Sequence, residues 1–263
     1  MSAWSSFFDE VNEAVDKYQE KYGETAIPFF RGQGDSSWHL QPGMLRTNCH
    51  PYYEQCMYYE FRAGAGMLIG HAMDSWDVAF SMQHYGLPTR ILDWTETFSV
   101  ALYFAITGMK NLATEEAAIW ILDPYELNKE TCGKDEILDL NDDFRHDYFT
   151  YFITDQREIE EFPEAVAVYP NRRNSRILAQ KGIFTIHKEQ KPLDVSFQRY
   201  VRKIVFKRDA LTGGERFLEL CGINVYTLFP ELPGLCEHLK DRYKEHLVFA
   251  ERQSWQRTSL KGE

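Results

Sequence analysis

The segment that decides the fold spans residues 83–95 and reads QHYGLPTRILDWT. An apolar stripe at helical spacing precedes it, and Gly86 ends that helix. Residues 89–92 are β-branched or apolar and predict a strand. A second helix follows, with its N-cap at Thr95 or Thr97. The sequence therefore predicts a unit of helix, turn, strand, turn and helix.

Helical and strand patterns alternate along the rest of the chain. A capping box at Ser6 and Asp9 predicts an N-terminal helix that ends at Gly23, and Asp74 or Ser75 can cap the helix before the central segment. Without an internal repeat or a linker, the pattern favours one mixed α+β domain. We further expect strands at residues 27–30, 118–122, 165–168, 183–187 and 202–206, helices at residues 52–71, 175–181 and 232–252, and a surface loop at residues 129–143.

The composition is that of a folded, acidic protein. Hydrophobic residues make up 44% of the 263 residues and aromatic residues 15%, which is enough for an aromatic-rich core. Lys and Arg number 29 against 40 Asp and Glu, a formal net charge of −11. A chain this acidic lacks the broad positive field that non-specific nucleic-acid binding needs. The dense basic stretches at residues 172–176 and 199–208 are expected to be solvated faces.

Several classes of site find no support in the sequence. The five cysteines are irregularly spaced and form no CxxC pair, so neither a disulfide framework nor a metal site is expected. The motifs of P-loop proteins, zincins and α/β-hydrolases are absent. The N-terminus lacks a signal-peptide pattern, and no apolar run reaches about 18 residues. A cytoplasmic location without a membrane partner is the default expectation.

Arg31 is the first candidate for a functional side chain. It follows a short apolar strand, and we expect it at the strand end, where Gly32 and Gly34 let the backbone approach a ligand. A guanidinium forms two parallel bonds with a phosphate or a carboxylate. Arg31 is therefore expected either to bind an anion or to pair with a core carboxylate such as Asp93.

The central segment supplies further candidates. His84, Arg90 and Asp93 offer acid, base and anion-binding roles. Trp94 and Tyr85 offer faces on which a nicotinamide or purine ring can stack. For His84 alone, a hydrogen-bonded core histidine is the alternative interpretation.

Long motifs in these regions resemble the FRG-domain family. The resemblance extends over residues from about 10 to 245 and implies one FRG-like domain over residues 1–263, with the helix at 232–252 at its C-terminal end. Members are mostly bacterial or phage-borne, which implies a toxin or defence effector, although the family name alone supplies no activity. The residues that carry the resemblance are Phe30-Arg31-Gly32-Gln33, Trp38, Leu40, Pro42, Arg46, the segments 83–90, 92–95 and 101–105, then Arg176, Gln180, Gly182, Phe184 and the segments 222–223 and 227–232.

A second resemblance, to the ADP-ribosyltransferases, implies a function. In those enzymes a strand with an Arg or His binds NAD, a strand end runs into an ALxFA helix, and a later strand carries a catalytic Glu. Residues 30–32 are similar to the first motif, residues 92–95 with 101–105 are similar to the second, and residues 176–186 lie where the third is expected. The resemblance implies an α+β fold with a mixed, mostly antiparallel sheet of the ADP-ribosyltransferase type surrounded by helices, and NAD as a substrate.

The catalytic Glu of that family has no counterpart at the expected place. The sequence offers Asn174, Arg176 or Gln180 there. Without a carboxylate, an oxocarbenium-like transition state loses much of its stabilisation. Glu189 and Asp93 are the candidate substitutes.

The same resemblance implies roles for individual residues. Arg31 would hold the pyrophosphate, Gln33 and Thr95 would position the ribose or the nicotinamide, and Arg31, His84 and Asp93 would carry the catalysis. The acceptor of ADP-ribose would be a nucleic acid or a protein. The set expected to bind the dinucleotide is Arg31, Gly32, Gln33, Tyr85, Thr89, Arg90, Trp94, Thr95 and Gln180.

Two other functions stay open. The missing Glu favours a non-enzymatic module that binds a nucleotide or a nucleic-acid end through Arg31 and Arg90. A metal-free hydrolase or nuclease that uses His84 and Asp93 ranks last, because no nucleophile is apparent.

Overall fold

One mixed sheet runs through the computed structural model, which describes residues 2–47, 50–66, 68, 73–154, 158–170, 175–188 and 191–259. The strand order is β4-β5-β6-β2-β1-β3-β7, and only β4 and β5 pair in parallel. This arrangement confirms the expected α+β class with a mostly antiparallel sheet, whereas the ADP-ribosyltransferase type stays a prediction. The strands are β1 Phe29–Gln33, β2 Ile91–Thr95, β3 Glu116–Leu122, β4 Leu138–Asp139, β5 Ala165–Tyr169, β6 Gly182–His187 and β7 Val201–Lys207.

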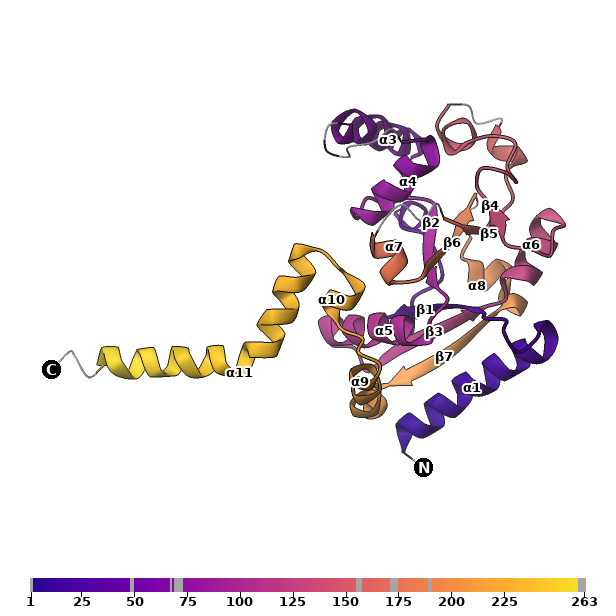
Figure 1. The fold of residues 1–263 in the computed structure, drawn as a ribbon. Helices are drawn as coiled ribbons and strands as arrows, with labels where there is room; N and C mark the ends of the chain where they lie inside the picture. The colour runs from indigo at the N-terminus through magenta and orange to yellow at the C-terminus, as the bar shows by residue number, and fades with distance from the viewer. Residues whose placement is uncertain are drawn as a thin grey trace.

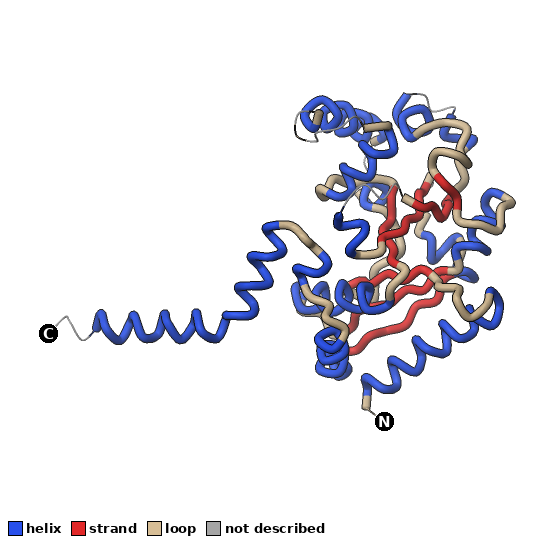
Figure 2. The backbone as a smooth tube through the Cα atoms, in the orientation of Figure 1, coloured by secondary structure: helices blue, strands red, loops and turns tan. Residues whose placement is uncertain are grey.

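Helices surround the sheet, as Figure 1 shows. The last helix, α11, extends away from the body of the molecule (Figures 1 and 2). No helix in the described ranges has the length and apolarity that crossing a bilayer would require. The α-helices are α1 Ala3–Tyr22, α2 Gly43–Arg46, α3 Pro51–Ala65, α4 Ser75–His84, α5 Phe98–Leu112, α6 Pro124–Cys132, α7 Ser175–Ala179, α8 Leu193–Ser196, α9 Leu211–Leu220, α10 Val225–Leu228 and α11 Leu232–Ser259.

The N-terminal helix begins earlier than predicted. The Ser2 hydroxyl accepts a hydrogen bond from the Ser5 backbone N–H at 3.1 Å and caps α1, so the predicted capping box at Ser6 and Asp9 is wrong. The predicted end is confirmed, because Gly23 adopts a φ of 100° just after the last helical residue. Only glycine takes this backbone conformation at little cost.

The structure places β1 and β2 further along the chain than the sequence predicted. β1 continues through Arg31 and Gly32 to Gln33, because all five of its residues pair with β3. The prediction that Arg31 lies at a strand end is therefore wrong, since it occupies the middle of β1. β2 runs from Ile91 to Thr95, so Asp93 is a strand residue too.

The acidic stretch after β3 is only partly the predicted loop. Asp123 accepts a hydrogen bond from the Glu126 backbone N–H at 3.1 Å and caps α6, which continues to Cys132. The short strand β4 then pairs with β5. The predicted loop at residues 129–143 is wrong where these two elements cover it. The helix predicted at residues 52–71 corresponds to α3, which ends at Ala65. The predicted end, at residues 69–71, lies outside the described part of the chain.

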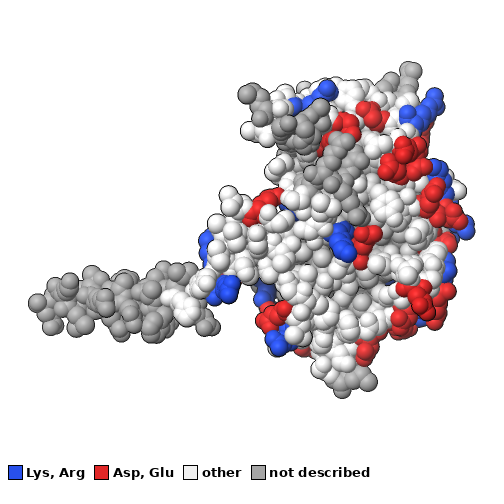
Figure 3. Space-filling model, in the orientation of Figure 1, with Lys and Arg blue, Asp and Glu red and all other residues white. Residues whose placement is uncertain are grey.

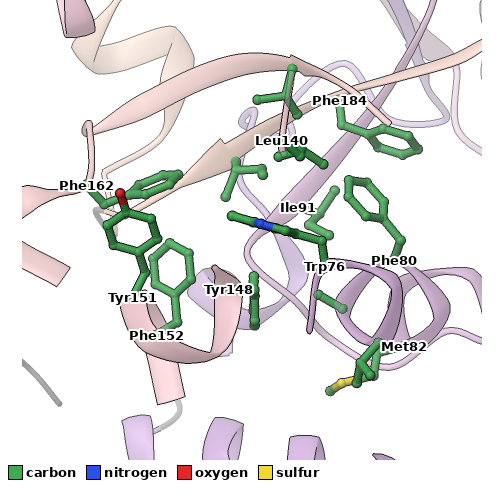
Figure 4. Packing of buried hydrophobic residues seen from close by; sticks show 14 of the residues in the cluster. Trp76, Phe80, Met82, Ile91, Leu140, Tyr148, Tyr151, Phe152, Phe162 and Phe184 are labelled. Atoms are coloured by element: carbon green, nitrogen blue, oxygen red, sulfur yellow. The ribbon is translucent and has the colours of Figure 1, made fainter. Parts of the chain in front are cut away.

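Three apolar clusters fill the space between the helices and the sheet. The first joins α3, α4 and η1 (Phe149–Thr154) to β2, β5 and β6, and its aromatic packing is seen in Figure 4. The second joins α1, α5 and α9 to β1, β3 and β7. The third lies on the opposite face, against α6 and α8. The first two clusters thus cover two different halves of one sheet, and β1 and β2 meet at their boundary.

The surface agrees with the acidic composition. On the face in Figure 3, Asp and Glu patches are more numerous than Lys and Arg patches, and no broad basic area is visible. In the basic stretch at residues 199–208, Arg199 pairs with Glu130 and Arg202 lies 3.7 Å from Glu10. Residues 172–174 lie outside the described part of the chain.

Candidate functional site

A cavity of about 330 Å³ opens where β1 and β2 diverge. The two strands pair only through Phe30 and Thr95, whereas β1 pairs with β3, and β2 with β6, along their whole lengths. The facing strand edges beyond that single pair are therefore free to border a cavity. The polar residues that line it are Arg31, Gln33, Arg46, Gln83, His84, Asp93, Thr95, Arg176 and Gln180, and the aromatic ones include Phe80, Phe104 and Phe184.

Arg31 bridges the gap between the two strands. Its Nη1 donates to the backbone oxygen of Asp93 at 2.5 Å and lies 3.8 Å from Asp93 Oδ2. The side chain is 19% exposed, and among the described residues its buried Nε has no hydrogen-bond partner. Burial lowers the pKa of Arg31, and nearby Arg46 lowers it further while Asp93 opposes the shift. A mostly buried guanidinium with an unused donor is suited to bind an anion.

Asp93 is held by a chain of hydrogen bonds from the end of α4. Its Oδ2 accepts from Gln83 Nε2 at 2.7 Å, and Gln83 Oε1 accepts from the Thr89 hydroxyl at 2.6 Å. Thr89 is buried and is not among the residues that line this cavity, so it positions Gln83, and its predicted contact with a ligand stays a prediction. The Asp93 side chain is 52% exposed and presents a carboxylate to the cavity.

His84 lies on the cavity wall opposite β1. Its carbonyl accepts a hydrogen bond from Arg176 Nη1 at 3.1 Å, and its Nε2 lies 3.5 Å from Glu231 Oε1. Burial, and after it the charge of Arg176, lower the pKa of His84. The imidazole is therefore neutral at neutral pH and able to accept a proton.

The segment at residues 228–231 contacts three residues that line the cavity, without lining it itself. Gln180 lines the cavity, and its Nε2 donates to the Leu228 carbonyl at 3.1 Å. The Arg176 guanidinium stacks on the Phe229 ring at 4.4 Å, and Glu231 reaches His84. Glu231 is a carboxylate that the sequence reasoning missed, because its partner lies far away along the chain. The predicted candidates Asn174 and Glu189 lie outside the described residues.

Trp94 lines the cavity, although its side chain packs in the third apolar cluster, whereas Tyr85 is not among the lining residues. Successive residues of a strand point to opposite faces, so Trp94 turns away from Asp93 into the third apolar cluster. Its indole N–H donates to the Thr185 hydroxyl at 2.9 Å. Tyr85 is 67% exposed and does not line this cavity. Stacking of a ligand ring on Trp94 or Tyr85 stays a prediction, and Phe104 is a further aromatic residue in the cavity wall.

Arg90 belongs to the core. Its Nε lies 2.9 Å from both carboxylate oxygens of Glu54, and its Nη1 donates to the Lys188 carbonyl at 2.9 Å. Glu54 also accepts from the Tyr148 hydroxyl, and the whole group is buried. The structure therefore gives Arg90 a structural role, and its predicted contact with an anionic ligand stays a prediction.

Gln33 and Thr95 are buried and already engaged. Gln33 donates to the His39 carbonyl at 3.2 Å and accepts from the Trp120 indole at 2.7 Å. The Thr95 hydroxyl donates to the Gln180 carbonyl at 2.7 Å. Both residues line the cavity, but these polar atoms form hydrogen bonds with other residues of the protein. They shape the site, and a direct contact of either with a ribose stays a prediction.

Gly32 serves helix packing. A Cβ atom at this position would lie 1.8 Å from the Ala101 carbonyl oxygen of α5, and one at Gly34 would lie 2.3 Å from the Gly108 carbonyl carbon. On the side of Gly32 where a Cβ would lie, the backbone of α5 comes close to β1, and this side is not open to a ligand. The approach brings Phe104 of α5 to the cavity.

The cavity also contains residues to which the sequence assigned no role. Arg46 and Trp38 line it, although they appeared only as members of a longer motif. No cluster of three or more His, Cys, Asp or Glu side chains suited to a metal occurs in the described ranges. The chain thus joins three arginines, one histidine and one aspartate around an apolar hollow, the features of a site for an anionic ligand with a ring.

A known protein family matches the part of the chain that contributes several of the cavity residues. The family model of the FRG domain matches residues 27–113. The match contains β1, α4, β2 and α5, and with them Arg31, His84 and Asp93. Arg176, Gln180 and Glu231 lie beyond it. No curated protein and no solved structure matches the chain.

Proposed function

We propose that the protein is an NAD-dependent ADP-ribosyltransferase-like enzyme whose site is the cavity between β1 and β2. The observation that carries the proposal is the meeting of Arg31 and Asp93 across one gap, 3.8 Å apart, beside an apolar hollow. Arg31 binds the pyrophosphate, because its fork matches two phosphate oxygens. Phe104 provides a face for the nicotinamide ring.

Transfer needs a carboxylate beside the reacting ribose. The bond from the ribose C1′ to the nicotinamide nitrogen breaks, its electron pair leaves with nicotinamide, and positive charge develops on the ribose. Asp93 stabilises that charge, since its Oδ2 is held by Gln83 while Oδ1 has no hydrogen bond within the described ranges. The acceptor oxygen or nitrogen then attacks C1′, and neutral His84 takes its proton.

The acceptor is a nucleic acid or a protein, which fits a toxin or defence effector. It approaches Asp93, the half-exposed member of the pair. Because the chain carries a net charge of −11, a nucleic-acid acceptor would have to bind through the local arginines of the site.

Nicotinamide release from NAD tests the proposal. Asp93→Asn keeps the size of the side chain but removes its charge, so the rate should fall about 100-fold or more while NAD still binds. Arg31→Lys keeps the positive charge but removes the two parallel N–H donors of the guanidinium, so NAD binding should weaken. Arg216→Ala changes an exposed residue outside the site and serves as the control. Intact NAD after incubation of the wild-type protein with cell lysate and a panel of acceptors would refute the enzymatic function.

One observation favours a second candidate, a nucleotide-binding module without turnover. The wall where ADP-ribosyltransferases carry their Glu is lined here by Arg176, Ile177, Gln180, Gly182 and Phe184, none of which is a carboxylate. Calorimetry followed by recovery of the ligand separates the two candidates. A binding module takes up NAD saturably and returns it unchanged, whereas the enzyme releases nicotinamide from it.

A further inference from the structure

A second cavity adjoins the first. It has a volume of about 440 Å³ and lies between α2 and the turn that follows α4. Arg46 and Gln83 line both cavities, so the two hollows meet at these side chains. The Met44 backbone N–H donates to the Thr89 carbonyl at 3.0 Å and fixes α2 against the turn. The two cavities therefore adjoin one another at Arg46 and Gln83.

Arg46 is an unpaired cation at the junction. It is exposed, and in the described ranges its guanidinium has neither an ion pair nor a hydrogen bond. Its charge is close enough to lower the pKa of Arg31. Among the described residues that line either cavity, Asp93 is the only carboxylate. Arg46 at the junction and Arg31 in the inner cavity thus have one lining carboxylate between them, and an anionic ligand relieves their mutual repulsion.

We propose that Arg46 and Arg31 together grip the pyrophosphate of a dinucleotide at the junction of the two cavities. This inference rests on the proposed function and specifies how the ligand lies. The nicotinamide riboside half enters the inner cavity beside Asp93 and His84. The adenosine half occupies the outer cavity, where Leu87 and Pro88 offer apolar surface and Thr47 offers a hydroxyl.

The volumes support this placement. Small-ligand sites usually occupy roughly 300–1,000 Å³. The inner cavity, at about 330 Å³, lies at the lower end of that range and the outer one, at about 440 Å³, adds a second compartment. A ligand of two linked nucleotides, with its charge in the middle, matches two compartments with cations at their junction.

Calorimetric titration with NAD and with nicotinamide mononucleotide tests the inference. Arg46→Ala should weaken NAD binding by about 10- to 100-fold, because a charge-assisted contact to phosphate is lost. Thr47→Trp fills the outer cavity, so it should weaken NAD binding by a similar factor and leave the mononucleotide unaffected. Arg216→Ala, outside both cavities, should bind both ligands as the wild type does.

The outcomes separate this inference from the proposed function. If the wild-type protein binds neither ligand, the proposed function fails and the inference fails with it. If the wild type binds NAD and both Arg46→Ala and Thr47→Trp bind it equally well, the inference alone is overturned. Should Thr47→Trp fail to fold, as a lost thermal transition would reveal, Arg46→Ala still decides the matter through the loss of NAD affinity.

Discussion

Arg31 and Arg90 carry the same guanidinium group, but their partners give them different roles. A buried carboxylate holds Arg90 through its Nε and Nη2, whereas Arg31 has a buried Nε without a partner in the described ranges. Glu54, the partner of Arg90, has a side chain only 2% exposed. A charge at that depth is tolerated only while it is paired.

Glu54→Ala should therefore destabilise the protein strongly. The change leaves Arg90 buried without its counter-ion, which typically costs about 3–5 kcal/mol in free energy of unfolding. Urea denaturation measures the change. The matched control is Arg145→Ala, which breaks the exposed pair of Arg145 and Glu161 at 3.4 Å and should change the stability by less than about 1 kcal/mol. Equal effects of the two variants would contradict the core role of Arg90.

His187 gives the protein a predictable dependence on pH. Burial, and after it the charge of Arg31, lower the pKa of His187 to about 3. Its Nε2 lies 2.8 Å from the Thr185 hydroxyl, which already accepts from the Trp94 indole and can donate to the unprotonated ring. The native ring therefore stays neutral at pH values where an unfolded histidine, with a pKa of about 6.5, binds a proton.

The direction of the change in stability with pH follows from the number of protons bound by the native and the unfolded states. Below a pH of about 6.5 the unfolded chain binds one proton more at this site than the native protein does. The free energy of unfolding therefore decreases as the pH is lowered from about 6.5 to the native pKa. Between pH 7 and pH 5 the loss should be about 2 kcal/mol in free energy of unfolding, and His187→Gln should abolish that part of it. Urea denaturation at the two pH values measures it. Parallel pH profiles of the wild type and the variant would contradict the assignment.

At the scale of elements, the contact of β1 with α5 fixes the floor of the cavity. Gly32→Ala places a methyl group 1.8 Å from the Ala101 carbonyl oxygen, so either the helix or the strand has to move. We expect a loss of about 3 kcal/mol or more in free energy of unfolding, because the obstacle is backbone. Chemical denaturation measures it.

A glycine in an open helix supplies the matched control. A Cβ at Gly64, in α3, meets no atom within 4 Å. Gly64→Ala should therefore stabilise the protein by about 0.5–1 kcal/mol, since alanine has the higher helix propensity. The close packing of α5 on β1 would be refuted by a Gly32→Ala protein as stable as the wild type.

The elements show which parts of the site a sequence can reveal. Periodicity revealed both strands, because alternation and helical stripes are local properties of the chain, but it placed them at residues 27–30 and 89–92, so that Arg31 and Asp93 fell just beyond them. It could not assign the partners of Arg90, since Glu54 lies 36 residues away and meets it only through packing. Glu231 was missed for the same reason. Trp94 could have been placed correctly, because it alternates with Asp93 in one strand.

At the scale of the whole molecule, the site lies where two halves of the sheet meet. One half, β4-β5-β6-β2, carries the first apolar cluster and the other, β1-β3-β7, carries the second. The halves are linked at the centre of the sheet by the single pair of Phe30 and Thr95. The Arg31 side chain adds a bond across the gap, to the Asp93 carbonyl. The boundary therefore has fewer backbone hydrogen bonds than either half, and a ligand bound there contacts both.

Hydrogen exchange should report this coupling. On saturation with NAD, backbone amides in residues 31–34 and 93–97 should exchange more slowly, because the ligand holds together two strand edges that lack a ladder. At a ligand concentration of about 100 times Kd the native state gains about 2.7 kcal/mol, enough for a clear slowing of exchange. Amides of α9, which borders neither cavity, should change only through global unfolding. Unchanged exchange at the β1 and β2 edges, with NAD shown by calorimetry to be bound, would place the ligand elsewhere on the molecule.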